Sequence, residues 1–583
     1  MEWKEQYKRW SSYSGLEAEM SEALLQLADK EEELEDCFYK HLEFGTGGMR
    51  GELGPGPNRL NRYTVRRAAE GLARFLTAKG AVAKERGVVI AYDSRYQSKE
   101  FAMEAALTLG RHRIRTWLFA ELRPTPELSF AVRYLEAEAG IMITASHNPP
   151  QYNGFKIYGP DGGQLPPGPA EALVRYVDAV ENELEIAVAD ELDLKKERLL
   201  HMIGADVDTA YLGQVKSLLV QPGLVKEWGG QLRMVFTPLH GAANLPVQRT
   251  FAESGFSALT VVAEQELPDP EFPTVVSPNP EEEEAFALAM EYGKKEQAEL
   301  LLATDPDGDR MGVAVRDVNG DYICLSGNQI GALLLDYLLS EKKRQQCLPT
   351  NGTVIKTIVT SEFGRAIAES YHMTTLDTLT GFKFIAEKIK EFEQTGEHTF
   401  LFGYEESYGY LIGDFARDKD AVQACLLTAE LAAYYKAKQM SLYEGLYALY
   451  EKHGYFEEGL TSVTLKGKAG LKKMAELLNA FRHSPPDILA GKRVTTIEDY
   501  QAASALNTVT GETVILDYPR SNVLKYKLED DSWFCVRPSG TEPKIKFYFG
   551  VKGTSEDDSR QRLKTLQDEV LERVEGFDGR VDE

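Results

Sequence analysis

The chain has 583 residues, 43% of them hydrophobic and 27% charged, so it is long enough for several globular domains. Its formal net charge of −25 excludes nucleic acid or an anionic membrane surface as a bulk partner, because both require a basic footprint. The five cysteines are scattered and form no CxxC pair, which excludes a disulfide framework or a zinc site and favours the cytoplasm. We expect neither a signal peptide nor a membrane-spanning segment, because the chain contains no long apolar run.

Helices and strands are expected to alternate in the N-terminal part of the chain. The charged residues 1–40 indicate helices, and residues 63–78 have apolar positions at helical spacing. A short apolar run at 87–92 predicts a buried strand, residues 99–109 predict a helix, and residues 140–144 predict a second strand. This alternation is typical of a parallel α/β domain, in which functional loops follow the carboxyl ends of the strands.

The same rhythm continues further along the chain. Strands are predicted at 233–236, 300–303 and 401–402, each followed by a loop rich in glycine, histidine or acidic residues. The acidic, proline-rich stretch 268–284 predicts a long surface loop. From about Tyr455 onward, Thr/Val/Lys-rich strands and a final charged helix indicate a separate α+β domain.

The loop at residues 144–150, with the sequence TASHNPP, follows a predicted strand, and its prolines prevent a helix. A serine held at a strand end beside a histidine is a candidate nucleophile. The alternative is a turn in which Ser146 or Asn148 bonds its own backbone. Lys156 follows closely and places a cation near the same loop, and this context favours the nucleophile.

A second loop, TDPDGDR at residues 304–310, is a candidate metal site. Three carboxylates stand at every second position: Asp305, Asp307 and Asp309. Mg²⁺ prefers such oxygen ligands, whereas a calcium EF-hand would need glycine and glutamate where Arg310 and Arg316 stand. A solvated acidic turn is the alternative, but the apolar strand 311–315 follows directly. Carboxylates packed between buried strands would repel one another unless a cation were bound, so a metal site is favoured, with Arg310 as a further cation at the end of the loop.

Two further loops carry polar groups. GYEESYG at 403–409 offers carboxylate and hydroxyl groups that suit sugar hydroxyls, although an exposed acidic turn is the alternative. RPSGTEP at 537–543 combines an arginine, hydroxyls and a glycine amide, which suits a phosphate group, although an ordinary surface loop is the alternative. The glycine-dense loop 44–51 contains Arg50 but matches neither a dinucleotide fingerprint nor a Walker P-loop.

Five motifs occur in one order along the chain: FGTGGMRG, TASHNPPQYNGFKIY, ATDPDGDRMG, GYEESYGY and RPSGTEPKIKFY. With them, the chain resembles the α-D-phosphohexomutase superfamily over nearly its whole length. Its length, Pro306 and residues 380–383 are most similar to the phosphoglucomutase and phosphopentomutase branch, particularly its bacterial members.

The resemblance implies an α/β fold with four domains around a central cleft, namely three related α/β domains with mixed sheets and a C-terminal α+β domain. Each domain is expected to carry one functional loop, for phosphoserine, metal, sugar and phosphate in turn. The expected domains are 1–207, 208–325, 326–455 and 456–583.

The resemblance also implies a reaction. A phosphorylated Ser146 donates its phosphate to glucose 1-phosphate, and the glucose 1,6-bisphosphate intermediate, which also acts as activator, returns its other phosphate and leaves glucose 6-phosphate. One Mg²⁺ per subunit is implied, held by Ser146, Asp305, Asp307 and Asp309. The residues implied near the transferring phosphate are Arg50, His147, Lys156 and Arg310, with Lys156 or a nearby group as general acid or base. The implied substrate contacts are Thr380, Gly381, Glu405, Ser407, Lys419, Arg537, Ser539, Gly540 and Thr541.

Three alternatives remain open from the sequence. The same chemistry could act on phosphopentoses or mannose phosphates, because Tyr404 and Tyr408 depart from the family's Gly-Glu-x-Ser-Gly pattern. A phosphatase would pass the phosphate to water, and a non-catalytic sensor would only bind the sugar phosphate. The intact Ser146 and the complete aspartate triplet argue against the sensor. The expected partners are small sugar phosphates, and the expected state is a cytoplasmic monomer or homodimer.

Overall fold

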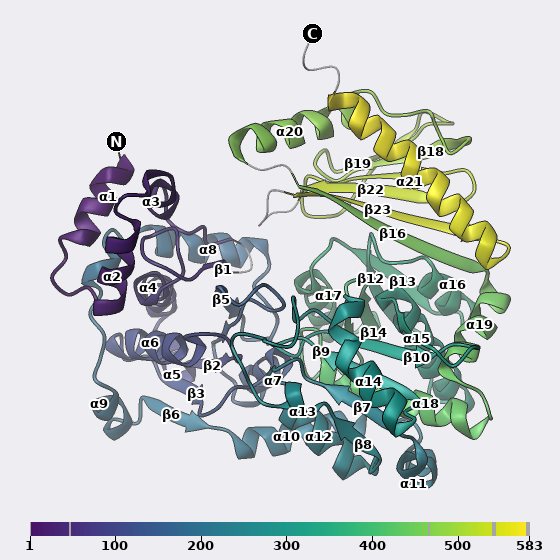
Figure 1. Cartoon of the computed structure of the whole chain (residues 1–583), viewed down its shortest axis with the longest axis horizontal. Helices are drawn as coiled ribbons and strands as arrows, with labels where there is room; N and C mark the ends of the chain where they lie inside the picture. Colours follow the sequence, from purple (N-terminus) through teal and green to yellow (C-terminus); the bar gives the residue numbers. More distant parts are fainter. Residues whose placement is uncertain (1, 46–47, 465–466, 539–543, 579–583) are drawn as a thin grey trace. The chain divides into compact units, whose positions relative to one another are not determined.

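The computed structural model of the chain divides into two compact units (Figure 1). The residues that it describes are 2–45, 48–464, 467–538 and 544–578. Unit 1 comprises 1–330, 341–353 and 381–443. Unit 2 comprises 331–340, 354–380 and 444–583. Among the described residues, no helix combines the length and apolar character that crossing a membrane requires.

Unit 1 opens with three helices that form a small core of their own. They are α1 (Glu2–Ser11), α2 (Ala18–Leu27) and α3 (Glu31–Phe38). Trp10 and Phe38 are fully buried where these helices meet, with their ring centroids 6.0 Å apart. The expectation of helices in this charged segment is confirmed.

A six-stranded mixed sheet follows, in the order β1-β5-β4-β2-β3-β6. Its strands are β1 (Met49–Glu52), β2 (Val88–Tyr92), β3 (Thr116–Phe119), β4 (Ala139–Ile143), β5 (Tyr152–Tyr158) and β6 (Leu200–Ile203). Strand β2 runs parallel to β3 and β4, and every residue of β2 and β4 is buried, as expected for central parallel strands. The accompanying helices are α4 (Arg62–Lys79), α5 (Ala81–Arg86), α6 (Ser98–Arg111), α7 (Thr125–Tyr134), α8 (Pro167–Asp178) and α9 (Glu191–Lys196).

The second sheet of unit 1 has five strands in the order β11-β10-β9-β7-β8. They are β7 (Met234–Thr237), β8 (Leu259–Val261), β9 (Leu300–Thr304), β10 (Met311–Arg316) and β11 (Tyr322–Leu325). Strands β9 and β10 are antiparallel neighbours, so the acidic loop between them forms a tight turn at one end of the sheet. The accompanying helices are α10 (Ala205–Ser217), α11 (Pro222–Trp228), α12 (Asn244–Ser254), α13 (Ala263–Glu266) and α14 (Ala287–Glu296).

Unit 1 also contains an antiparallel pair, β14 and β15, whose connecting turn carries the glutamate loop. The elements of this segment are α17 (Phe382–Thr395), β14 (Thr399–Glu405), β15 (Gly409–Leu411) and α18 (Ala421–Ala437). Helix α15 (Gly327–Arg344), whose residues 331–340 belong to unit 2, is preceded by the N-cap residue Ser326, whose side chain forms a capping box with Gln329.

Unit 2 contains β12 (Gly352–Thr357), which starts in unit 1, and α16 (Phe363–Ser370), β13 (Thr374–Thr378) and α19 (Leu442–His453). Its largest part is an antiparallel sheet in the order β16-β23-β22-β21-β18-β19-β20, with the short β17 beside β18. These strands are β16 (Tyr455–Thr464), β17 (Ile488–Leu489), β18 (Lys492–Asp499), β19 (Ser504–Asn507), β20 (Thr513–Ile515), β21 (Leu524–Leu528), β22 (Trp533–Pro538) and β23 (Lys544–Gly553). Helices α20 (Gly467–His483) and α21 (Glu556–Asp578) lie beside this sheet (Figure 1). Their apolar side chains form one buried cluster with those of the sheet.

One expectation from the sequence needs correction. The stretch 268–284 is a long loop, but it is not confined to the surface. Phe272 is 1% exposed, and residues 278–280 are buried as well. The prediction was wrong because it followed the proline and acidic residues that dominate this loop and gave no weight to its single aromatic residue, Phe272, whose burial anchors it.

Candidate active site

Ser146 lies in the turn that follows β4, the position where parallel α/β sheets present functional loops. Its φ of 54° is in the left-handed region, which is uncommon for residues other than glycine. The Ser146 amide donates a hydrogen bond to Thr144 Oγ1 at 2.7 Å, and its hydroxyl donates one to Asp305 Oδ2 at 2.7 Å. His147 Nδ1 lies 3.3 Å from the same hydroxyl oxygen. The serine is therefore held in one orientation, toward the acidic loop.

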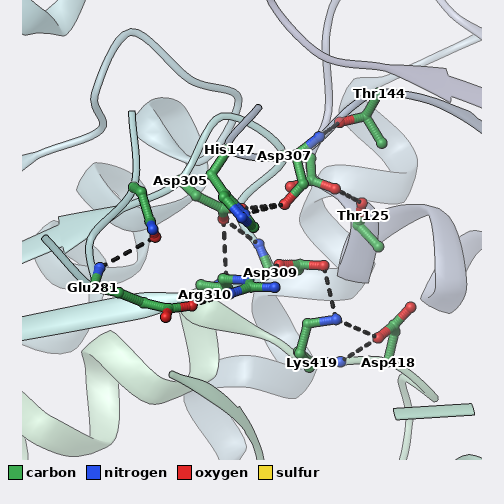
Figure 2. Close-up of polar contacts among 12 residues, drawn as sticks. Thr125, Thr144, His147, Glu281, Asp305, Asp307, Asp309, Arg310, Asp418 and Lys419 are labelled. Carbon is green, nitrogen blue, oxygen red and sulfur yellow. Dashed lines mark hydrogen bonds and ion pairs between the residues drawn. The ribbon is translucent and has the colours of Figure 1, made fainter. Parts of the chain in front are cut away.

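The acidic loop gathers its three carboxylates in the turn between β9 and β10 (Figure 2). All three aspartates are at most 2% exposed, and one ligand oxygen from each lies within 4.8 Å of the others. Asp305 Oδ1 accepts hydrogen bonds from the amides of Asp309 at 3.1 Å and Arg310 at 3.0 Å. Gly308, with a φ of 64°, permits the tight turn.

Two lysines and one threonine from other parts of unit 1 contact this cluster. Lys156 Nζ donates to Asp307 Oδ2 at 2.9 Å, and Thr125 Oγ1 donates to the same oxygen at 3.0 Å. Lys419 Nζ lies 3.0 Å from Asp309 Oδ2 (Figure 2). The two ammonium groups offset part of the charge of the three carboxylates.

Burial and mutual repulsion shift the acidity of the three carboxyl groups. Burial and the charge of Asp307 raise the pKa of Asp305 well above its usual range, and the same two causes raise that of Asp309. Although burial disfavours its charge as well, the Lys156 ammonium lowers the pKa of Asp307. One member of the cluster is thus held firmly anionic while its neighbours resist ionisation.

The donor set suits a hard divalent cation. Within the described part of the chain, Asp307 Oδ1 and Asp309 Oδ1 are buried and have no hydrogen-bond partner. Buried polar atoms without partners cost free energy, and a cation bound by these oxygens would remove that cost. The ligands are all oxygens, as Mg²⁺ prefers, and the residues therefore fit this ion.

Cationic groups surround the serine as well. Arg310 is paired with Glu281, and its Nε lies 3.8 Å from Asp309 Oδ1 (Figure 2). Arg50 Nη1 donates to Asn148 Oδ1 at 2.9 Å, next to the serine loop. Burial and the charges of Arg310 and Arg50 lower the pKa of His147 well below its usual range, so its imidazole is neutral.

The glutamate loop lies in the turn between β14 and β15. Glu405 is 4% exposed and accepts a hydrogen bond from the Gly381 amide at 2.8 Å. Burial raises the pKa of Glu405 to about 7, against the opposing effect of the Lys419 charge. Ser407 is half-buried at the tip of the turn, and Thr380 is half-buried beside Gly381.

The two tyrosines that depart from the family pattern have different surroundings. Tyr404 is fully buried in β14, with its ring 5.3 Å from that of Phe402. Tyr408 has a φ of 62°, so it adopts the left-handed backbone that glycine favours, and its carbonyl accepts a hydrogen bond from the Met311 amide at 3.0 Å. Gly409 is required, because a Cβ there would lie 2.1 Å from Lys419 Cδ.

The remaining predicted phosphate-binding residues are not brought to this cluster within unit 1. Arg537 belongs to β22 in unit 2, where it stands opposite Lys546 of β23. Ser539, Gly540 and Thr541 lie outside the described residues. The residues gathered in unit 1 are Arg50, Ser146, His147, Lys156, Asp305, Asp307, Asp309, Arg310, Gly381, Glu405, Ser407 and Lys419.

Three supporting residues were missed in the sequence. Thr125 is the first residue of α7, between Pro124 and Pro126. In the sequence, a threonine among prolines indicates only the start of a helix. Glu281 is one of several acidic residues in an acidic loop, so nothing distinguished it. Gly241 supports the metal loop, because a Cβ there would lie 2.6 Å from Pro306 Cα. Its position after a predicted strand was the available signal.

Family models match the chain in four consecutive segments. They are described as phosphoglucomutase/phosphomannomutase alpha/beta/alpha domains I, II and III, at residues 41–184, 209–320 and 326–453, and as the C-terminal domain, at 464–573. The phosphoglucomutase of Staphylococcus aureus (strain USA300) is 38% identical over 534 residues, which is 92% of this chain and 94% of that protein.

Solved structures share the fold. Parafusin, a phosphoglucomutase from Paramecium, matches with a TM-score of 0.67 and 16% identity over 93% of this chain and 95% of its own. A phosphoglucomutase/phosphomannomutase family protein from Burkholderia thailandensis matches with a TM-score of 0.64 and 19% identity, over 91% and 97% of the two chains.

These matches and the cluster around Ser146 define a phosphohexomutase, an isomerase of carbohydrate metabolism. The chain belongs to the phosphoglucomutase/phosphomannomutase family. The resemblance to the α-D-phosphohexomutase superfamily and the expected α/β fold with four domains are confirmed.

Proposed function

We propose that the protein is a phosphoglucomutase that interconverts glucose 1-phosphate and glucose 6-phosphate through a phosphoserine at position 146. The observation that carries this proposal is the hydrogen bond of 2.7 Å from Ser146 Oγ to Asp305, within a cluster of buried carboxylates. The name of the Staphylococcus relative supports the choice of glucose phosphates.

The aspartates and the Ser146 oxygen would together hold one Mg²⁺ per chain, which would neutralise charge on the transferring phosphate. Arg310 and Arg50 add positive charge near the serine, and this favours a phosphate dianion there. The neutral His147 ring lies beside the oxygen that would carry the phosphate. Charge stabilisation and positioning are the main contributions that a protein makes to phosphoryl transfer.

Lys156 is our candidate for the group that moves the proton. In the first transfer, the bond between Ser146 Oγ and phosphorus breaks and the new bond to the sugar oxygen forms, while the Lys156 ammonium gives a proton to the freed Ser146 Oγ and regains one from the attacking hydroxyl. In the second, the other phosphate of glucose 1,6-bisphosphate returns to Ser146 Oγ, and the proton of the serine hydroxyl passes by the same route to the freed sugar oxygen. Lys156 Nζ is held 2.9 Å from Asp307, next to the serine loop, and is therefore placed to serve both steps.

The sugar and its second phosphate would contact the remaining residues. Glu405 and Ser407 offer acceptors and a donor for the sugar hydroxyls, near the Lys419 ammonium. Gly381 adjoins this loop through its hydrogen bond to Glu405, and we assign Thr380 to the substrate on the basis of the family motif. We assign the phosphate that does not react to Arg537, Ser539, Gly540 and Thr541 on the basis of the family motif.

The domain boundaries, cellular location and assembly remain proposals too. We propose domains at 1–207, 208–325, 326–455 and 456–583, each with one functional loop. We propose the cytoplasm as its location, because none of the five cysteines, all in the described part of the chain, forms a disulfide, and thiols stay reduced there. We propose a monomer or homodimer as its assembly.

A substrate panel tests the sugar preference. The purified enzyme is assayed with the 1-phosphates of glucose, mannose, ribose and deoxyribose, with glucose 1,6-bisphosphate present throughout. We expect the highest kcat/KM for glucose 1-phosphate. A preference for ribose or mannose 1-phosphate would overturn the choice of substrate but not the phosphoserine mechanism. Release of inorganic phosphate at the rate of isomer formation would instead support a phosphatase.

A further inference from the structure

Arg95 is a buried cation directly behind the serine loop. Its side chain is 0% exposed, and it lies in the segment between β2 and α6. Burying a charged side chain is costly unless other groups pair with it, so the partners of Arg95 indicate its role.

These partners are mainly carbonyl oxygens of the serine loop. Arg95 Nη2 donates to Ser146 O at 2.5 Å and also to Asn148 O. Arg95 Nη1 donates to Pro149 O at 2.8 Å and to Tyr152 O at 3.0 Å. One guanidinium therefore binds three carbonyls of the loop that carries the nucleophile and one carbonyl at the start of β5.

Arg95 is itself held from both sides. Asp93 Oδ2 lies 3.4 Å from Arg95 Nε, and Asp93 Oδ1 accepts hydrogen bonds from the Arg95 amide at 3.0 Å and from Ser98 Oγ at 2.8 Å. The ring of Phe272 faces the guanidinium, with its centroid 5.1 Å from Arg95 Cζ. Phe272 is the buried anchor of loop 268–284, which leads from the second sheet. This loop therefore covers the Arg95 guanidinium with an aromatic ring.

The backbone of Ser146 needs such support. Its φ of 54° is disfavoured for a residue with a side chain. Both backbone polar groups of Ser146 are held: Arg95 donates to its carbonyl oxygen, and its amide donates to Thr144 Oγ1. The two contacts together fix the backbone conformation of this residue. Without both contacts the loop could relax and turn Oγ away from Asp305.

We propose that Arg95 is a positioning residue for phosphoryl transfer, which fixes the left-handed conformation of Ser146 by binding three carbonyls of its loop and the carbonyl of Tyr152 under the ring of Phe272. This inference rests on the proposed role of Ser146 as phosphate carrier. None of the contacts above joins Arg95 to Ser146 Oγ or to the three aspartates of the loop 304–310. Its effect is therefore expected on the rate of transfer and not on the binding of the sugar phosphate.

Arg95→Lys is the decisive variant, because it keeps the charge but replaces a planar fork with a single point donor. Arg67→Lys is the matched control, since Arg67 is also a buried arginine. It lies in α4 and pairs with Asp178 at the end of α8, at 3.0 Å. For each folded variant, kcat, KM and the single-turnover rate of transfer from the phosphorylated enzyme are measured.

We expect kcat and the single-turnover rate of Arg95→Lys to fall about 100-fold, as a misplacement of about 1 Å can cause, while KM changes less than about threefold. Arg67→Lys keeps its kcat. An Arg95→Lys variant that is folded and transfers phosphate at the wild-type rate would overturn the proposal. So would a rise in KM with no change in the single-turnover rate.

Phe272→Leu decides the matter if Arg95→Lys does not fold. This variant leaves Arg95 in place under an apolar side chain and removes only the attraction between the guanidinium and the aromatic face. A fall in the single-turnover rate of about fivefold at constant KM supports the proposal, and an unchanged rate overturns it. Phosphate on Ser146 is measured by mass spectrometry in every sample. A wild-type enzyme that turns over without ever carrying it would disprove the phosphoserine mechanism, whatever Arg95 does.

Discussion

Ser146 Oγ and Asp305 Oδ2 are joined by a hydrogen bond of 2.7 Å, although 159 positions separate the two residues in sequence. The serine follows β4 of the first sheet, and the aspartate follows β9 of the second. Two sheets of unit 1 therefore each contribute one functional loop to a single cluster. A phosphate on the serine would lie against the carboxylates, and this arrangement is stable only with a cation between them.

Removal of divalent metal is expected to abolish turnover and to lower stability. Chelation leaves Asp307 Oδ1 and Asp309 Oδ1 without partners. Mg²⁺ at a hundredfold excess over its Kd stabilises the folded state by about 2.7 kcal/mol. Thermal unfolding with and without Mg²⁺ measures this shift. Asp307→Asn should lose most of the shift, and about 100-fold or more of the activity. Asp321→Asn, in an exposed turn of the same sheet, should keep both. An unchanged shift in Asp307→Asn would contradict the metal assignment.

Lys156→Gln is expected to lower kcat by about 100-fold to 10,000-fold, the range that a positioned proton donor or acceptor contributes. The variant also removes the ammonium that lowers the pKa of Asp307. Steady-state kinetics at several pH values measure both effects. Lys216→Gln is the control, since Lys216 forms a surface ion pair with Glu253. If Lys156→Gln retained at least a third of wild-type kcat, another group would have to move the proton.

KM for glucose 1-phosphate is expected to fall as the pH rises through about 7. Burial raises the pKa of Glu405 to about 7, so the acceptor form that binds sugar hydroxyls predominates only above that pH. The phosphate of the substrate titrates nearby, and Glu405→Gln separates the two effects because it keeps only the titration of the phosphate. Equal pH profiles of KM for the wild type and Glu405→Gln would exclude a role for this ionisation.

The N-terminal helices are expected to detach in acid. Glu183 is 0% exposed, and Arg9 Nη2 and Trp10 Nε1 donate to it at 2.6 and 2.8 Å. Burial opposes its charge, but the His41 ring, whose Nε2 lies 3.6 Å from Glu183 Oε2, its own backbone amide and the charge of Arg9 lower its pKa to about 2. Because the folded pKa is depressed, the stabilisation is complete above the unfolded pKa and is lost as the pH falls from about 5 to about 2.

The size of this effect is on the order of 3 kcal/mol, from a shift of about 2.5 pKa units at about 1.4 kcal/mol each. Glu183→Gln should lose that stability at pH 7 and show little further loss in acid. Urea unfolding at pH 7 and pH 3, followed by the fluorescence of Trp10 and the other tryptophans, measures it. Equal losses in the wild type and the variant between the two pH values would contradict this assignment.

Much of unit 1 was predictable from the sequence. The apolar runs at 87–92 and 300–303 became β2 and β9 within two residues, because a strand buried on both faces reads as a continuous apolar segment. The acidic triplet could be recognised because three charges between two such strands require compensation. The tyrosine at 408 could not be interpreted, because only its φ of 62° shows that it takes a backbone suited to glycine.

Contacts between distant segments were not predictable. No pattern in the sequence connects Phe272 with Arg95, or Glu281 with Arg310, because single residues in loops carry no periodicity. Thr125 reads equally well as a helix-start residue. Each of these side chains acquires its role only when two sheets fold against each other, which a local pattern does not encode.

The phosphorylation state of Ser146 during turnover tests the central claim most directly. The enzyme is incubated with glucose 1,6-bisphosphate, quenched, digested and mapped by mass spectrometry, with Ser146→Ala in parallel. We expect one phosphate per chain, on Ser146, and a loss of activity of at least about 1,000-fold in Ser146→Ala. Wild-type activity in Ser146→Ala, or a phosphate on another residue that turns over at the rate of the reaction, would contradict it.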